Sequence, residues 1–129
     1  MFRLITFGGL LLQQDGILHL GPAAQRRRLA ILAVIAAARG RGVSRERLVS
    51  LLWPESSPEA GRHSLYQAIH AIRRALGSDE VLLGSIALQL NSNLITSDIN
   101  EFELANEQGA YERAVRLYRG PFLEGFRLD

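Results

Sequence analysis

The sequence contains no cysteine and no lysine, and it has one tryptophan and four prolines among 129 residues. Without cysteine there is no disulfide framework, no thiolate zinc site and no cysteine nucleophile, which fits a reducing cytoplasm. No apolar run approaches the roughly 20 residues needed to cross a bilayer. The first residues, MFRLITF, interleave charge with apolar side chains, unlike a secretion signal. We therefore expect a cytoplasmic protein without a membrane partner.

The residues that are present predict one domain, or one domain with a small appendage. Apolar residues make up 47% of the chain, which is ample for a packed core. Charge is distributed unevenly: residues 1–97 hold 11 arginines and six acidic residues, whereas residues 98–129 hold four arginines and seven acidic residues. A cationic front is compatible with a polyanion, and an anionic tail is poorly suited to one.

The chain is organised around a helix predicted between Ser57 and Gly77. Ser57 can cap the free amide donors, and Pro58 suits the first helical turn because it has no N–H to satisfy. Glu59 complements the positive end of the helix dipole, and Gly77 supplies a left-handed stop. These signals predict a helix over residues 58–76.

The two faces of this predicted helix differ in chemistry. One face carries an apolar stripe, formed by Leu65, Ile69, Ile72 and Leu76. The opposite face is polar and positively charged, and its members are His63, Gln67, His70 and Arg74, flanked by Tyr66 and Arg73. No acidic residue lies between Glu59 and Asp79. Such a face suits reading base edges in the major groove of DNA, and the alternative is an ordinary solvated surface.

Two arginines outside this face are candidate phosphate contacts, Arg26 and Arg62. Arg26 belongs to a run of three arginines in the first turns of a helix predicted over residues 23–39, whose inward residues are Leu29, Leu32 and Ala36. Positive charge at the N-terminal end of a helix opposes the helix dipole, so the arginine run is a candidate for a functional role. A solvated arginine run is the alternative.

The remaining elements predict a winged helix. A strand over residues 2–7 precedes a hairpin around Asp15-Gly16, in which Leu11, Leu18 and Leu20 share one face and His19 is exposed. Residues 44–53 are predicted to form a second helix with an inward stripe of Leu48, Leu51 and Leu52. A short turn joins it to the helix at 58–76, which is the spacing of a helix-turn-helix. A second hairpin over residues 81–90 takes the place of the wing. Its turn contains no arginine, which predicts weak contact with a minor groove.

From Ser97 onward the pattern becomes that of a helical hairpin. Asp98 and Glu101 resemble a capping box, and a second helix is predicted over residues 109–119. The end, GPFLEGF, carries more large apolar groups than two short helices can bury. We expect it to pack on the first domain, on a partner or on the rest of a longer protein.

Several motifs in this order resemble those of the SARP-type bacterial transcriptional activators, in which an OmpR-type winged helix precedes a helical bacterial transcriptional activator domain. The motifs are Asp15-Gly16 followed by Gly21-Pro22 and Gln25-Arg26, VSRERLVSLLWPE from Val43, IRRALG from Ile72, and LYRGPFLEGF from Leu117. The resemblance covers nearly the whole chain. Family members continue beyond the first helix pair, so the chain is expected to be a fragment or a reduced regulator.

The resemblance implies an α+β fold: a winged helix-turn-helix with an N-terminal antiparallel sheet and a C-terminal wing hairpin at residues 1–97, then a short helical hairpin at residues 98–129. It places the same six residues of the third helix on double-stranded DNA. It also implies homo-oligomers on repeated sites and contact with RNA polymerase, for which Pro54–Ser57 is a candidate. Where the family usually has an aromatic residue and often an arginine at the wing, this chain has Ser85, Ile86 and Ala87.

The sequence therefore favours a sequence-specific DNA-binding transcription regulator. The alternative is a winged helix used for protein association or dimerisation, with weak or lost DNA binding. An enzyme is not predicted, because no serine has an identifiable base and orienting acid. His63 and His70 are seven residues apart, without the i, i+4 spacing or the further ligands of a metal site. We assign no catalytic residue, metal or cofactor.

Overall fold

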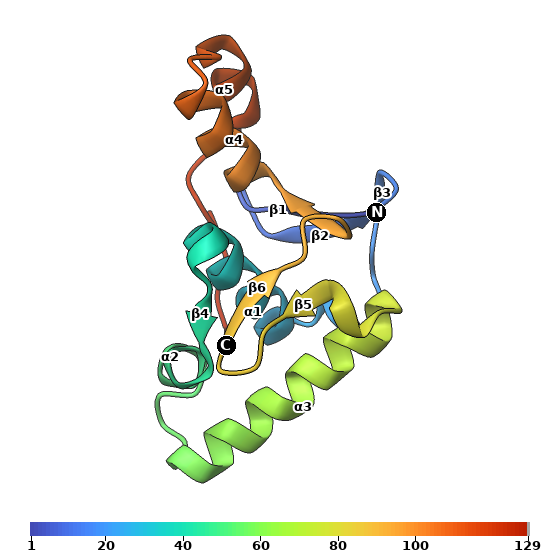
Figure 1. Cartoon of the computed structure of the whole chain (residues 1–129), viewed down its shortest axis with the longest axis vertical. Coiled ribbons are helices and arrows are strands. Elements are labelled where there is room, and N and C mark those ends of the chain that lie inside the picture. Colours follow the sequence, from blue (N-terminus) through green and yellow to red (C-terminus); the bar gives the residue numbers. More distant parts are fainter. Residues whose placement is uncertain (129) are drawn as a thin grey trace.

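Helix α1 (Arg26–Ala38) occupies the centre of the computed structural model, which describes residues 1–128 (Figure 1). The predicted inward residues Leu29, Leu32 and Ala36 are buried, and so are most residues between them. The helix is therefore buried on most of its circumference, which matches a sequence that is apolar all round. It begins later than predicted because Pro22–Ala24 forms a separate 3₁₀ turn, η1. Gln25 between the two is extended, with ψ 141°.

Four strands form the N-terminal sheet in the order β3-β2-β1-β7. Their bounds are β1 Phe2–Ile5, β2 Leu11–Gln14, β3 Ile17–Leu18 and β7 Ile95–Ser97. The predicted tight turn at Asp15-Gly16 is confirmed, with φ 51° and 82°. The sequence did not predict the parallel pairing of β1 with β7.

The predicted faces of the first hairpin are confirmed, because Gln13 pairs with Leu18 and Leu12 therefore shares its face with His19. Leu12 is fully buried, whereas Leu18 and Leu20 are exposed. Leu12 lies opposite the buried Leu4 of β1, and residues opposite each other in neighbouring strands point to the same face of a sheet. His19 is half-buried rather than exposed, and its ring meets that of Phe2 edge-on. The pairing with β1 therefore sets the inward face, and the hairpin alone does not reveal it.

Helices α2 (Arg45–Leu52) and α3 (Pro58–Leu76) form the helix-turn-helix. Ser57 caps α3 through a hydrogen bond from the amide of Ala60, and Gly77 ends it with φ 77°, both as predicted. On α2 the prediction is wrong at one position, because Leu51 is 44% exposed and Val49 is buried in its place. These two residues flank the buried Leu48 on opposite sides, and α3 packs on the Val49 side.

A three-stranded sheet forms the wing, in the order β4-β6-β5. The predicted hairpin is present as β5 (Leu82–Leu83) and β6 (Ala87–Leu90), and β4 (Val43–Ser44) adds a strand that the sequence did not predict. Short 3₁₀ turns precede β4 and β5, at η2 (Arg39–Arg41) and η3 (Asp79–Val81). The α+β winged helix-turn-helix predicted from the sequence is confirmed.

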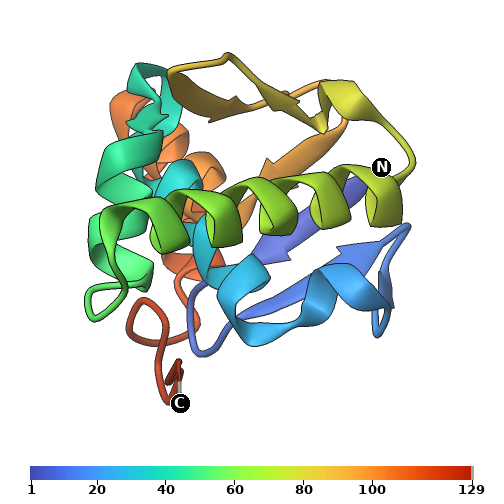
Figure 2. The ribbon, with the colours of Figure 1, turned by 90° about the horizontal axis from the view of Figure 1, so that it is seen from below.

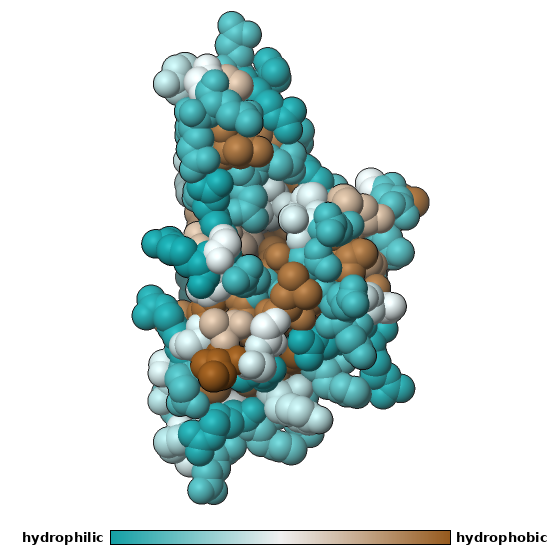
Figure 3. All heavy atoms as spheres, viewed as in Figure 1, coloured by the Kyte–Doolittle hydropathy of each residue, from teal (hydrophilic) through white to brown (hydrophobic). Residues whose placement is uncertain are grey.

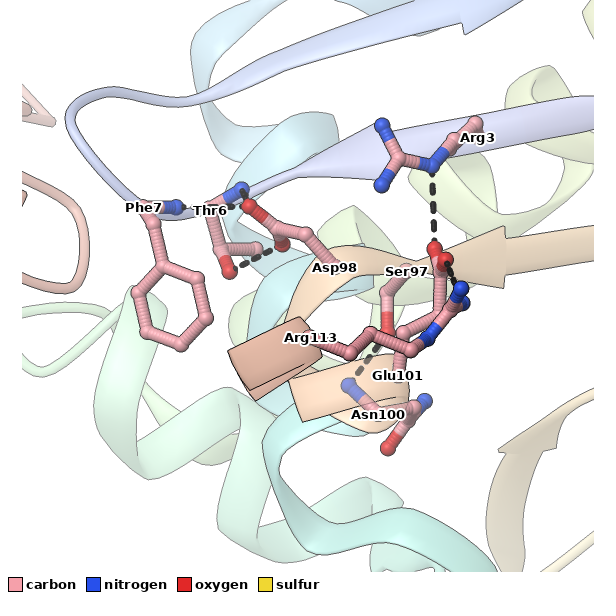
Figure 4. Close-up of polar contacts among 8 residues, drawn as sticks. All are labelled: Arg3, Thr6, Phe7, Ser97, Asp98, Asn100, Glu101 and Arg113. Atoms are coloured by element: carbon pink, nitrogen blue, oxygen red, sulfur yellow. Dashed lines mark hydrogen bonds and ion pairs between the residues drawn. The ribbon is translucent and has the colours of Figure 1, made fainter. Parts of the chain in front are cut away.

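Helices α4 (Asp98–Glu107) and α5 (Tyr111–Leu117) form the expected hairpin. The capping-box interpretation is wrong, because Ser97 caps α4 through a bond from the amide of Asn100. Asp98 is instead buried and accepts hydrogen bonds from Thr6 and Phe7 at the end of β1 (Figure 4). The hairpin is therefore tied to the N-terminal sheet by a buried carboxylate.

The segment after α5 returns to the first part of the chain, which is one of the expected outcomes. Phe7 packs its ring against those of Phe102 and Tyr118, at centroid distances of 5.2 Å each. The amide of Leu123 donates to the carbonyl of Thr6, and Phe122 forms a bridge with Phe7. The domain boundary at residue 97 stays a prediction. In the described part of the chain no helix has the length and apolar character needed to cross a membrane.

Candidate nucleic-acid interface

Helix α3 presents one long face to solvent. Figure 2 looks onto this face, with the helix lying across the front of the molecule. Its 19 residues span about 28 Å at 1.5 Å per residue. The buried side is the predicted stripe with Ala68 and Gly61 added, and the exposed side includes His63, Tyr66, Gln67, His70 and Arg74. Five of the six predicted DNA-binding residues are therefore accessible on one surface, which we call the α3 outer face.

The α3 outer face carries uncompensated positive charge. Among the ion pairs of residues 1–128, none involves Arg74, His63 or His70. A groove of about 400 Å³ runs beside the C-terminal half of α3, where Pro22, Ala71 and Ala75 complete a lining shared with His70 and Arg74. Arg74 and His70 are therefore free to donate to a polyanion lying along the helix.

Arg73, the sixth predicted residue, lies apart from the α3 outer face. It is half-buried, and its Nη2 donates to the carbonyl of Leu82 at 2.7 Å. Its Nε is buried and has no hydrogen-bond partner among the described residues. The side chain thus joins the C-terminal half of α3 to strand β5 of the wing, where it can hold the wing at a fixed position relative to the helix.

The two candidate phosphate contacts lie in different places. Arg62 is exposed on the first half of α3, 3.8 Å from the carboxylate of Glu46, and this solvated pair holds it weakly. Arg26 is exposed, but its Nη1 donates to the carbonyl of Arg127 at 2.6 Å, so the C-terminal segment engages it. Arg62 therefore continues the positive surface of α3, whereas Arg26 contacts the tail.

The neighbours of Arg26 have structural contacts. Arg27 donates from Nε to the carbonyl of Leu52 at 3.0 Å, and its guanidinium lies 5.8 Å from the ring centre of Trp53. Arg28 donates to the carbonyl of Pro22 at 2.9 Å. Carbonyl acceptors, one of them at the end of α2, thus explain why three arginines tolerate the positive end of α1.

Sequence reasoning missed Arg45, which lies against the turn of the wing. Its backbone amide donates to the carbonyl of Ile86 at 2.9 Å, and its Nε donates to the carbonyl of Ser85. Because β4 pairs with β6, the residue after Ser44 reaches that turn. The pairing of Val43-Ser44 with the wing would have indicated where Arg45 lies. A strand of two residues is too short to be predicted from sequence.

No three side chains of histidine, aspartate and glutamate come together in a metal-binding arrangement within residues 1–128. The arrangement instead suits a helix that enters a groove in DNA, because exposed hydrogen-bonding groups and positive charge share one side of α3.

Comparison with known proteins agrees with this geometry. Residues 22–85 match the family described as transcriptional regulatory protein, C terminal. The structure of Mycobacterium tuberculosis EmbR in complex with a low-affinity phosphopeptide is similar over 98% of this chain, with a TM-score of 0.71 and 25% sequence identity. This chain spans 38% of the length of that EmbR chain. Comparison with curated protein sequences gives no match.

The family match and the fold similarity confirm the predicted resemblance to SARP-type regulators with an OmpR-type winged helix. The matched residues include the whole helix-turn-helix and the first strand of the wing. Such domains are generally not enzymes. Residues 22–85 thus resemble the transcriptional regulatory proteins of that family.

Proposed function

We propose that this chain binds double-stranded DNA in a sequence-specific manner and reads the major groove with the α3 outer face. The observation that carries the proposal is that this face exposes His63, Tyr66, Gln67, His70 and Arg74 without an acidic residue among them. The major groove of B-DNA admits an α-helix, and each base pair there presents a distinct pattern of donors and acceptors.

The residues of the α3 outer face, together with Arg62, have two roles in this proposal. Gln67 lies at the middle of the helix and carries an amide that can pair with the donor and acceptor of adenine. Arg74 and Arg62 lie towards the two ends, where the helix approaches the DNA backbone, and they suit phosphate contacts. In this proposal Arg73 positions the wing and does not touch a base, because its Nη2 is bonded to Leu82.

Selection of bound sequences from random duplex DNA tests the proposal directly. We expect an enriched motif that contains adenine at one position, and Gln67→Ala should relax the preference there by about 1–3 kcal/mol. Gln108→Ala is the matched control, because Gln108 is exposed at the end of α4. The proposal fails if no motif is enriched, or if Gln67→Ala selects the same motif with unchanged affinity.

A second prediction concerns Arg74 and salt. Each phosphate contact releases condensed counterions, so Arg74→Ala should weaken binding to all sequences alike and reduce the salt slope of log K by about 1. Fluorescence anisotropy over a range of salt concentrations measures this slope. Arg116→Ala on α5 removes the same charge away from α3 and should leave the slope unchanged. Equal slopes in the Arg74 variant and the wild type would contradict the assignment.

The further partners follow from this proposal. We propose binding to repeated sites as a homo-oligomer, with RNA polymerase contacted through the exposed turn between α2 and α3, residues 54–57. A regulator with a chromosomal target would act in the cytoplasm of a bacterium. Light scattering of the complex with one and with two copies of the selected motif measures the stoichiometry.

A specific observation favours the alternative function, a module for protein association. The helical hairpin exposes four large side chains, Leu104, Tyr111, Val115 and Tyr118, each at least 47% accessible. Figure 3 shows an apolar area on this part of the molecule. A stable oligomer in light scattering that ignores duplex DNA at low salt would support the alternative and exclude DNA reading.

A further inference from the structure

The turn of the wing, residues 84–86, presents an isoleucine to solvent. Ile86 is 81% exposed, and Leu83 on the adjoining strand is 41% exposed. Figure 3 shows an apolar area where Figure 1 places this turn. We call residues 84–86 the wing tip. A side chain so exposed contributes little to the stability of the fold, so Ile86 is available for contact with a partner.

The backbone of the wing tip is held in place on both sides. Arg45 donates its amide to Ile86 and its Nε to Ser85. Gly84 has φ +98°, and a Cβ at that position would lie 2.0 Å from the carbonyl oxygen of Ala87. The turn therefore requires glycine and has a defined shape. Ile86 is presented by an ordered turn, at little further entropic cost on binding.

The wing tip belongs to the same surface as α3. Figure 2 shows the wing running alongside α3, and the bond from Arg73 to Leu82 fixes its base to that helix. With α3 in the major groove, as proposed, a wing beside it would lie over the adjacent minor groove. The guanidinium of Arg45 lies at the wing tip and supplies positive charge there, although the tip itself has none.

We propose that Ile86 enters the minor groove as an apolar wedge between two adjacent base pairs and bends the duplex. This inference rests on the proposed function and adds a second contact to it. Aliphatic side chains inserted from the minor groove partly unstack the bases and kink DNA by about 20–90°. Pyrimidine–purine steps unstack most readily, so such a step is expected under the wing.

A protein partner explains the wing tip less well. Stable interfaces bury about 800 Å² on each partner. The wing tip offers one large apolar side chain, accompanied only by glycine and serine, and a guanidinium lies beside it. A narrow apolar point next to positive charge fits a polyanion with an apolar interior, which is what stacked base pairs provide.

The bend can be measured by energy transfer between dyes at the two ends of a duplex that carries the selected motif. We expect the wild type to bend this duplex, and Ile86→Ala to abolish most of the bend and weaken binding about tenfold, as expected for removing most of a buried aliphatic side chain. Ile86→Leu should keep the bend. The matched control is Ile17→Ala, because Ile17 is 74% exposed on β3 of the other sheet.

The outcomes separate this inference from the proposed function. If Ile86→Ala bends DNA like the wild type while Gln67→Ala loses specificity, the wedge is refuted and DNA reading by α3 stands. If the wild type binds no duplex, both proposals fail. If light scattering shows that Ile86→Ala dissociates a dimer while each bound protomer bends DNA as before, the wing tip is a protein contact and the inference is overturned.

Discussion

Replacing Asp98 with alanine is expected to lower the free energy of unfolding by about 3–5 kcal/mol. The carboxylate accepts hydrogen bonds from the amides of Thr6 and Phe7 at 2.9 Å and from the hydroxyl of Thr6 at 2.6 Å (Figure 4). Asp98 and Thr6 are buried, with exposures of 3% and 0%. Alanine would leave buried donors without an acceptor. Such groups cost more than the bonds themselves contributed in the native state.

Urea unfolding followed by circular dichroism measures this effect, with unchanged slope as the check for two-state behaviour. Glu112→Ala is the matched control, because Glu112 also lies in the first turn of a helix but is exposed. It should cost less than 1 kcal/mol, on the order of a surface substitution. A loss below 1 kcal/mol for Asp98→Ala would show that the carboxylate does not hold the hairpin to the sheet.

Replacing Gly61 with leucine is expected to destabilise the helix-turn-helix by about 3 kcal/mol, by overpacking. A Cβ built at Gly61 lies 2.5 Å from Cγ1 of Val49, which is shorter than any van der Waals contact. Val49 is 8% exposed and branched at Cβ, so it cannot rotate away freely. Leucine would push α2 and α3 apart where Gly61 meets Val49, and this would change the helix spacing on which the proposed DNA binding depends.

A double-mutant cycle identifies the cause of this effect. Gly61→Ala should destabilise despite the higher helix propensity of alanine. Val49→Ala frees the space that the new methyl group needs. The combination of the two should therefore cost less than the sum of the single changes, with a coupling of about 1 kcal/mol or more. Additive losses would mean that the two helices do not touch at this point. Thermal unfolding and DNA affinity of each variant report fold and function separately.

Local signals were enough to predict α3. Its first and last residues follow from Ser57, Pro58 and Gly77, and its two faces follow from the spacing of side chains along one helix. Each of these depends on residues within a few positions of one another. The general fold could be predicted for the same reason, since capping residues, turn residues and apolar periodicity mark almost every element.

Predictions failed where a distant segment decides the environment. Leu51 and Val49 are both apolar and adjacent to the buried stripe of α2, and only the packing of α3 at Gly61 selects Val49. The sequence left open which face of the first hairpin is buried, and the pairing of β2 with β1 buries Leu12. Asp98 resembled the first residue of a capping box, but its partners Thr6 and Phe7 lie more than 90 residues earlier.

The candidate site shows the same division. Exposure of His63, Gln67, His70 and Arg74 could be read from helical spacing. The positions of Arg73, Arg26 and Arg45 could not, because an arginine side chain reaches several residues beyond its own element. Each of these three donates to a backbone carbonyl of a different segment, at Leu82, Arg127 and Ser85 respectively.

The place of β1 between β2 and β7 constrains how the chain folds during synthesis. β1 begins at the second residue, yet its parallel neighbour ends at residue 97, and the carboxylate that accepts from Thr6 and Phe7, just after β1, belongs to residue 98. When α3 has left the ribosome, one side of β1 is still open and the amides of Thr6 and Phe7 are still bonded to water. The nascent chain therefore cannot complete its first sheet until the helical hairpin starts to emerge, and folding of the two parts is coupled from the outset.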